Sequence, residues 1–270
     1  MHSGRIDPNR PGESIRRYHG RKGEKDEMAT LLIRERYKVV RAIAAQPGYA
    51  LLEAVDISDR ETPSCLLNLY EGELLHRYAR ICVGIRKEEC PAFRGMFLEK
   101  GTLAVVFDRS EGQPIDSLFY RGDTWSWQDR LAWAELLMHR ALSLANLPPE
   151  VSCAALLSDN LLFDLTNKRV SIRWMLQPME EMNQREAVLL AADHVKKILP
   201  RTLRAGDTEY RFLEQLEAGT LRSVVDLYGK WRDAESAIRT EREEFEHKNF
   251  IKRGLILLGR AFRRRRARED

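Results

Sequence analysis

The side chains that could do chemistry in this sequence are few, and most of them lie close together after a proline pair. Asp159 and Asn160 stand in a short polar stretch, and Asp164 follows four residues later. Carboxylate and amide oxygens can hold Mg²⁺, and a carboxylate can also act as a general base. Glu99 is a further candidate by residue type alone. A simpler interpretation of Ser158 to Asn160 is a turn, because Ser, Asp and Asn all favour turns.

Zinc and thiol chemistry are not supported by the cysteines and histidines. No two cysteines form a C-x-x-C pair and the six histidines are scattered, whereas a zinc site needs closely spaced ligands. We therefore expect reduced thiols, no metal and no cofactor, as in a cytoplasmic protein. No N-terminal apolar run resembles a signal peptide, and no apolar run approaches the roughly 20 residues that span a bilayer.

The elements that must position these side chains change character along the chain. The first half alternates apolar runs with turns, which predicts five strands and one helix. The expected strands are 37–44, 50–56, 65–70, 93–99 and 102–108, and the expected helix is 71–84. The second half has apolar residues at helical spacing. We expect helices over 127–145, 184–199, 209–216 and 221–247, with two short strands at 160–163 and 170–174. This order is typical of a two-lobed α+β protein.

Between the first two of those helices and through the two short strands, the sequence resembles the catalytic centre of the protein-kinase family. A kinase catalytic loop reads H-R-D-x-x-x-x-N, and a short hairpin then leads to D-F-G. With Asn160 on the Asn of this motif, His-Arg-Asp falls on Cys153, Ala154 and Ala155. Asp-Phe-Gly falls on Trp174 and the two residues after it. The resemblance therefore implies a kinase-like fold whose catalytic base and metal-binding aspartate are replaced.

The remaining nucleotide-site motifs of the family are also depleted. The stretch 102–119 resembles the fifth strand, hinge and following helix, so Phe107 takes the gatekeeper position and Asp108 to Ser110 the hinge. The Gly-rich loop corresponds to 44–48, which retains one glycine. Asn68 stands where the phosphate-binding lysine belongs, and Glu71 or Glu73 stands where its glutamate partner belongs. Phe107, Asp108, Ser110 and Asn160 are thus the weak candidates for nucleotide contacts.

These losses favour a degenerate, bacterial-type pseudokinase over an enzyme. Only seven residues, 177–183, separate the D-F-G position from the next helix, so the segment that positions a protein substrate is nearly absent. We expect a small five-stranded N-lobe over 28–110 and a reduced helical C-lobe over 111–247, after a disordered leader at 1–27. The expected role is a scaffold or regulator of a protein partner. The alternative is an atypical phosphotransferase that uses Asp159, Asp164 or Glu99.

The tail at 248–270 carries the basic character of the chain. Its nine Lys and Arg against Glu269 and Asp270 give +7, while the whole chain is only +4, which leaves −3 for residues 1–247. Apolar and basic side chains fall on opposite arcs of a helix, a pattern typical of helices at anionic membrane surfaces. The expected contact residues are Phe250, Ile251, Leu255, Leu258, Phe262, Arg260, Arg263, Arg264, Arg265 and Arg266. Docking of the apolar arc on the protein itself, and binding of nucleic acid, are the alternatives, and nucleic acid is the weaker one because no recognised motif accompanies the arginines.

Overall fold

The structure is a computed structural model that describes residues 31–269, with side chains to residue 265. Its contacts form two compact units. Of the described residues, the first unit contains those up to Gly112 together with Asn146–Leu162 and Ser171–Met182, and the second unit contains the others. The continuous lobe ranges that we predicted stay predictions, and the predicted leader at 1–27 lies outside the described residues.

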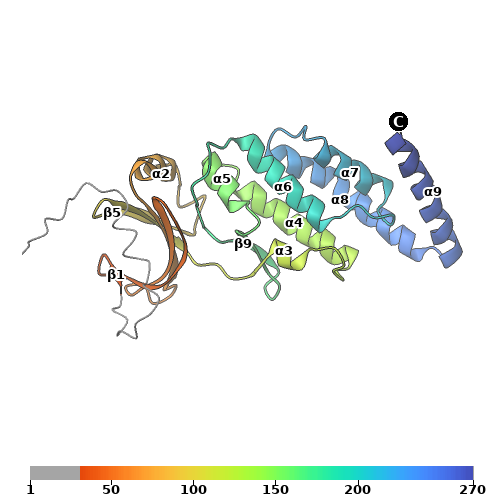
Figure 1. Ribbon diagram of the computed structural model, residues 1–270. Coiled ribbons are helices and arrows are strands. Elements are labelled where there is room, and N and C mark those ends of the chain that lie inside the picture. The colour runs from red at the N-terminus through yellow and green to blue at the C-terminus, as the bar shows by residue number, and fades with distance from the viewer. Residues whose placement is uncertain (1–30, 270) are drawn as a thin grey trace, which may run out of the picture. The chain divides into compact units, whose positions relative to one another are not determined.

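The first unit is built on a curled antiparallel sheet of six strands, in the order β1-β2-β3-β4-β6-β5 (Figure 1). The strands are β1 (Leu32–Ile33), β2 (Tyr37–Gln46), β3 (Tyr49–Asp56), β4 (Ser64–Tyr70), β5 (Phe93–Glu99) and β6 (Thr102–Asp108). The pairing of β2 with β3 shifts register twice, and such irregularities increase the local twist of a sheet. The five predicted strands are present, and β1 adds a sixth strand of two residues.

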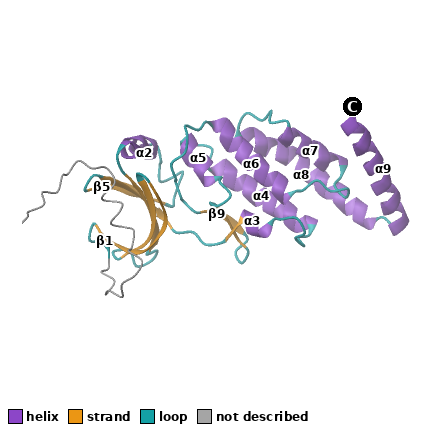
Figure 2. Ribbon diagram, viewed as in Figure 1, coloured by secondary structure: helices purple, strands orange, loops and turns teal. Residues whose placement is uncertain are grey.

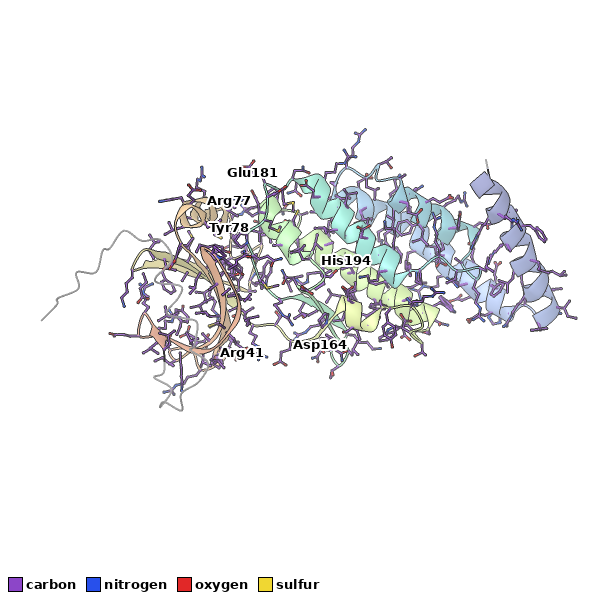
Figure 3. All side chains as sticks on the ribbon, viewed as in Figure 1. Arg41, Arg77, Tyr78, Asp164, Glu181 and His194 are labelled. Carbon is purple, nitrogen blue, oxygen red and sulfur yellow. The ribbon has the colours of Figure 1, made fainter. Side chains whose placement is uncertain are left out.

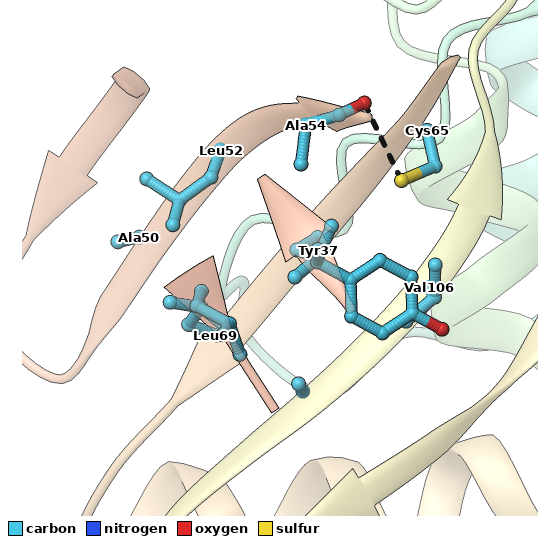
Figure 4. Packing of buried hydrophobic residues seen from close by; sticks show 10 residues of the cluster. Tyr37, Ala50, Leu52, Ala54, Cys65, Leu69 and Val106 are labelled. Atoms are coloured by element: carbon cyan, nitrogen blue, oxygen red, sulfur yellow. Dashed lines mark hydrogen bonds between the residues drawn. The ribbon is translucent and has the colours of Figure 1, made fainter. Parts of the chain in front are cut away.

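The strands β3, β4 and β6 are buried along nearly their whole length, and since successive side chains point to opposite faces, they are buried on both faces. Ala50, Leu52 and Ala54 of β3 contribute to one apolar cluster, together with alternate residues of β4 and β6 (Figure 4). The Cys65 thiol contacts the Ala54 carbonyl oxygen at 3.5 Å in this cluster. The intervening residues, which include Asn68, face the other way. The strand period therefore places the polar side chain of Asn68 on the second face, together with Leu66 and Tyr70 of the same strand.

Two helices complete the first unit. The helix α2 (Glu73–Val83) contacts β4 and β6, and its buried residues are Tyr78 and Cys82. The helix α5 (Pro149–Ala155) begins with Pro149, a residue well suited to the first turn because its missing N–H has no intrahelical partner there. All five residues from Val151 to Ala155 are buried.

A second, three-stranded sheet consists of β7 (Gln113–Pro114), β8 (Leu161–Asp164) and β9 (Arg169–Ile172).

The second unit is mainly helical (Figure 2). Its helices are α3 (Ile115–Leu118), α4 (Trp127–Ser143), α6 (Gln184–Ile198), α7 (Asp207–Glu217), α8 (Val224–His247) and α9 (Phe250–Glu269). Helices α4, α6, α7 and α8 contact one another, and Trp231 of α8 is fully buried among them. Their ends agree with the predicted ranges to within about three residues, and the pattern of apolar residues accounts for this agreement.

Helix α7 takes its N-terminal cap from α8. Gly206 precedes α7 and offers no side chain to cap it. Glu241 of α8 instead accepts hydrogen bonds from the Thr208 backbone N–H at 3.1 Å and the Thr208 hydroxyl at 2.6 Å. A side chain at Gly206 would collide with the Glu241 carboxylate. The bidentate pair of Glu209 with Arg242, at 2.7 Å for both contacts, joins the same two helices.

Across the described residues, none of the helices is both long enough and apolar enough to cross a membrane.

Candidate functional site

Asn68, the residue at the expected lysine position, links β4 to the segment around Trp174. Its amide NH₂ donates to the Trp174 carbonyl oxygen at 2.9 Å. Its amide oxygen accepts from the Leu176 N–H at 2.8 Å and from the Tyr49 hydroxyl at 3.0 Å. The side chain is fully buried. A neutral amide with both ends bonded to the protein holds the chain together at this point and offers no positive charge to a phosphate.

Two tyrosines bind the same segment. The Tyr70 hydroxyl donates to the Leu176 carbonyl oxygen at 2.6 Å, and the Tyr78 hydroxyl donates to the Gln177 carbonyl oxygen at 3.2 Å. Their rings stack at 4.1 Å between centroids. Burial raises the pKa of Tyr70 well above its ordinary value and that of Tyr78 to about 12. Both hydroxyls therefore stay protonated and remain donors across the physiological range of pH.

Trp174, the residue at the expected metal-ligand position, is a core aromatic residue. Its ring stacks on the Phe107 ring with 5.1 Å between centroids and 11° between planes. It is 5% exposed, and Phe107 is fully buried. The predicted gatekeeper and the replaced metal ligand therefore contact each other directly, in an offset geometry that aromatic pairs favour.

Asn160 and Ala155 are buried near this segment. The Asn160 amide NH₂ donates to the carbonyl oxygens of Ala154 at 2.7 Å and Met175 at 2.9 Å. Its amide oxygen has no hydrogen-bond partner among the described residues. Ala155, at the expected catalytic-base position, is the last residue of α5 and is fully buried. The region that we predicted as a catalytic loop is thus a helix over the stretch where the base would stand.

The predicted hinge lies at a small polar pocket. Asp108 accepts a hydrogen bond from Arg94 at 2.6 Å, and its backbone N–H donates to the Ala92 carbonyl oxygen. The pocket has a volume of about 440 Å³ and is lined in part by Ser110 and Arg173. Glu53 lies in its wall between two arginines, at 2.7 Å from Arg41 and 3.0 Å from Arg109. The charge of Glu53 is thus balanced within the pocket wall by these two arginines.

The other predicted phosphate-binding motifs are also used structurally. Pro47 and Gly48 form a tight turn between β2 and β3, with Gly48 at φ 73°, and Leu74 of α2 packs close to its Cα. Glu71 accepts a hydrogen bond from the Thr102 hydroxyl at 2.9 Å, and Glu73 is exposed at the start of α2. The helix α2 contributes Tyr78 to this side of the sheet (Figure 3).

The carboxylates of the alternative hypothesis have separate environments. Asp164 closes the β8–β9 turn, where it accepts from the backbone N–H groups of Thr166 and Asn167 and from Arg169 (Figure 3). The Asn167 hydrogen bonds hold its pKa below the ordinary value. Asp159 is exposed beside Asn160, and Glu99 lies on the edge strand β5 with Lys100 at 3.9 Å. Within residues 31–269 no three His, Cys, Asp or Glu side chains form a group that could hold a metal ion.

The tail forms a helix, α9, whose arginine side contacts the protein. The Arg264 guanidinium donates to the carbonyl oxygens of Thr202 at 2.7 Å and Ala205 at 3.0 Å, and Arg260 donates to that of Arg204 at 3.1 Å. Arg264 also lies 4.3 Å from the centre of the Tyr210 ring. Among the predicted contact residues, Arg260 and Arg264 thus form an inner group that binds the loop between α6 and α7. The five apolar residues form an outer group.

The outer group of α9 is apolar and exposed. Phe250 is 90% exposed, and the exposed fractions of the other four lie between 59% and 73%. These four are Ile251, Leu255, Leu258 and Phe262. The side chain of Arg266 lies outside the described residues. The sequence predicted the two arcs, but it could not predict which arc contacts the protein.

Comparison with solved structures identifies the fold. The kinase domain of PknI from Mycobacterium tuberculosis, in a double-mutant form, matches with a TM-score of 0.50 and 12% identity, over 80% of this chain and 99% of that chain. A second structure of this domain matches with a TM-score of 0.50 and 11% identity, over 79% of this chain and 99% of that one. No family model matches the sequence, and neither does any curated protein. The chain therefore has a protein-kinase-like fold, as predicted.

Sequence reasoning missed the residues that surround Trp174. Tyr49, Tyr70 and Tyr78 belong to no kinase motif that we used, yet they bind the same stretch of backbone directly or through Asn68. One signal was available. Asn68 and Tyr70 are two residues apart in β4, so alternation places them on the same face of the sheet. Tyr49 of β3 is paired directly with Tyr70, which brings it to that face as well.

Proposed function

We propose that this protein is a catalytically inactive kinase-like module that works by binding a protein partner, as a scaffold or regulator. The observation that carries the proposal is the set of side chains at three positions. Asn68, Ala155 and Trp174 stand where a kinase has its phosphate lysine, base and metal aspartate, and all three are buried. None of them can carry charge or exchange a proton in the physiological range.

The way in which these positions are filled supports the proposal further. A kinase that had lost its activity through one substitution would keep an open nucleotide site. Here the Trp174 ring stacks on Phe107, and the Asn68 side chain binds the backbone at Trp174. Restoring one residue would therefore create a buried charge without a partner, which costs several kcal/mol. The base, the metal aspartate, the phosphate lysine and the substrate-positioning segment are all depleted, and this favours binding over phosphoryl transfer because a single loss is more easily replaced by a nearby residue.

The first test is a phosphoryl-transfer assay with labelled ATP, Mg²⁺ or Mn²⁺ and generic protein substrates. We expect no transfer above the buffer control. Asp159→Asn and Glu99→Gln are the informative variants if transfer occurs, whereas Asp164→Asn would also disturb the β8–β9 turn. Transfer that disappears with one of these changes would replace this proposal with the atypical phosphotransferase.

The second test is nucleotide binding by thermal shift. A ligand stabilises the folded state by RT ln(1 + [L]/Kd), so a weak ligand near its Kd contributes less than about 0.5 kcal/mol. We expect millimolar ATP to change the melting temperature little, and Mg²⁺ to make no difference. A large shift that requires Mg²⁺ would contradict the roles given to Asn68 and Trp174.

The proposed place of action is the cytoplasmic face of an anionic membrane, reached through the tail. Support comes from the net charge of +7 in residues 248–270, which derives from nine basic and two acidic residues. Lysine and arginine near an anionic surface each contribute about 1 kcal/mol, and added salt weakens this contribution. Sedimentation with phosphatidylserine vesicles and with pure phosphatidylcholine vesicles tests the placement, and equal sedimentation with both would contradict it.

A further inference from the structure

The orientation of α9 separates its arginines into two groups with different tasks. In the loop between α6 and α7, Arg260 donates to the carbonyl oxygen of Arg204, and Arg264 donates to those of Thr202 and Ala205. A guanidinium has five N–H donors, so one arginine can bind several carbonyl oxygens of a single loop. Burial lowers the pKa of Arg264, in keeping with this inner place.

The opposite side of α9 has the reverse character. Phe250, Ile251, Leu255, Leu258 and Phe262 fall within an arc of about 140° at 100° per residue, and each is more than half exposed. A cluster of large apolar side chains in water is uncommon on a soluble protein and usually marks a binding surface. We call these five residues the outer face of α9.

Basic residues border the outer face and point to its occupant. Lys252 and Arg263 lie beyond one edge of it on the helix, and both are exposed, although Arg263 also lies 3.7 Å from Asp207 of α7. An apolar strip with cations beside it matches the boundary between acyl chains and anionic headgroups, where amphipathic helices lie. A neutral protein surface would satisfy the apolar strip but not the adjacent cations.

We infer that the outer face of α9 lies in the interface of an anionic lipid bilayer, while Arg260 and Arg264 bind the protein and not the lipid. The inference rests on the membrane placement proposed above and adds which side of the helix enters the lipid. The helix is then attached to the helical unit by one side and to the membrane by the other. Consequently the two arginine groups make different contributions to vesicle binding.

The experiment compares three double variants of the full chain on phosphatidylserine-containing vesicles. Leu255→Glu with Leu258→Glu changes the outer face and should reduce the partition coefficient by about tenfold or more. Arg260→Gln with Arg264→Gln removes two inner charges and should reduce it by less than about twofold, whereas lipid-bound arginines would each account for about fivefold. Val83→Glu with Leu98→Glu adds the same charge at exposed apolar residues of the first unit and should have no effect.

A fluorescent label reports the position of the outer face directly. The four native cysteines are buried, and burial raises the thiol pKa of both Cys65 and Cys82 to about 12, so they react slowly. A polarity-sensitive dye on Leu258→Cys should shift to the blue when vesicles are added. The same dye on Ile57→Cys, an exposed position of the first unit, should not shift.

The outcomes separate this inference from the proposals before it. If wild type binds vesicles and the outer double variant binds equally well, or the inner variant loses as much as the outer one, the assignment of faces is wrong and membrane placement stands. If the wild-type protein binds no vesicles, the membrane placement and the assignment of faces are both wrong. The nucleotide tests still decide the pseudokinase proposal in that case. If the outer variant instead dissolves a dimer seen by sedimentation equilibrium, the occupant is a second copy and the lipid inference is overturned.

Discussion

The segment around Trp174 and the helix α9 treat polar and apolar groups in opposite ways. Around Trp174 the apolar ring is buried and the neighbouring carbonyl oxygens have donors from Asn68, Tyr70 and Asn160. On α9 the five apolar residues of the outer face are exposed. A protein rarely leaves large apolar groups exposed without a function that uses them, whereas satisfied buried groups stabilise the fold. The buried groups around Trp174 therefore stabilise the fold, whereas the outer face of α9 leaves its apolar side chains in water.

The strongest way to break this comparison is to remove the polar link at Asn68. Asn68→Leu leaves the Trp174 carbonyl, the Leu176 N–H and the Tyr49 hydroxyl without their partner. Since each unsatisfied buried group costs about 1–3 kcal/mol, we expect a loss of about 3–5 kcal/mol in the free energy of unfolding, measured by urea titration. Asn146→Leu makes the same change at an exposed residue and should stay within about 0.5 kcal/mol. Equal effects would mean that the Asn68 contacts contribute nothing.

Acid should weaken the first unit through a buried carboxylate. The hydrogen bond from Arg36 lowers the pKa of Asp56 from 3.8 to about 2, and Ser58 adds to the effect. A carboxyl group with a lowered pKa in the folded state stabilises above its unfolded pKa, so this contribution of about 2 kcal/mol should disappear as the pH falls from about 4 to 2. Asp56→Asn should be less stable at pH 7, and its difference from wild type should narrow towards pH 2. A constant difference over that range would contradict the role of Asp56, and Asp159→Asn is the exposed control.

A milder change tests one hydrogen bond to the segment around Trp174. Tyr70→Phe removes the donor to the Leu176 carbonyl oxygen and leaves the ring stack with Tyr78 in place. We expect a loss of about 1–2 kcal/mol, because one buried acceptor loses its partner. Differential scanning calorimetry measures this loss of stability. In the same measurement Tyr120→Phe, at an exposed tyrosine, should leave the stability unchanged. A neutral Tyr70→Phe would show that water replaces the missing donor.

The smallest expected effect concerns α9 itself. An alanine methyl group at Gly254 or Gly259 meets no atom within 4 Å, and neither glycine has a positive φ. Each replacement by Ala should stabilise the helix by about 0.5–1 kcal/mol. Amide hydrogen exchange over α9 should slow accordingly. Gly229→Ala is an equally open change in α8 and should leave exchange in α9 unaltered.

The sequence was a good guide where one local pattern determines the structure. The hairpin strands at 93–99 and 102–108 agree with β5 and β6 to the residue. Apolar alternation and the Lys100-Gly101 turn explain this agreement, because both signals act between neighbours in the chain. The protein-kinase-like fold followed from the order of such elements.

The sequence was a poor guide where a motif alignment replaced the local pattern. The alignment placed a catalytic-loop motif over Cys153 to Ala155, whereas these residues form the last turn of α5, which starts at Pro149. A proline at the first helical position is itself a start signal, so the information was present. No local pattern could predict that Arg264 binds the protein, because the carbonyl oxygens that it binds lie 59 and 62 residues earlier in the chain.

The cap that Glu241 places on α7 has a consequence for how the chain is made. Thr208 leaves the ribosome 33 residues before Glu241, an interval of about 2–7 s at ordinary rates of translation. During that time α7 exposes Phe212, Leu213 and Leu216 without the helix that later covers and caps it. The nascent helical unit therefore passes through a stage at which a chaperone that binds apolar helix faces could compete with folding.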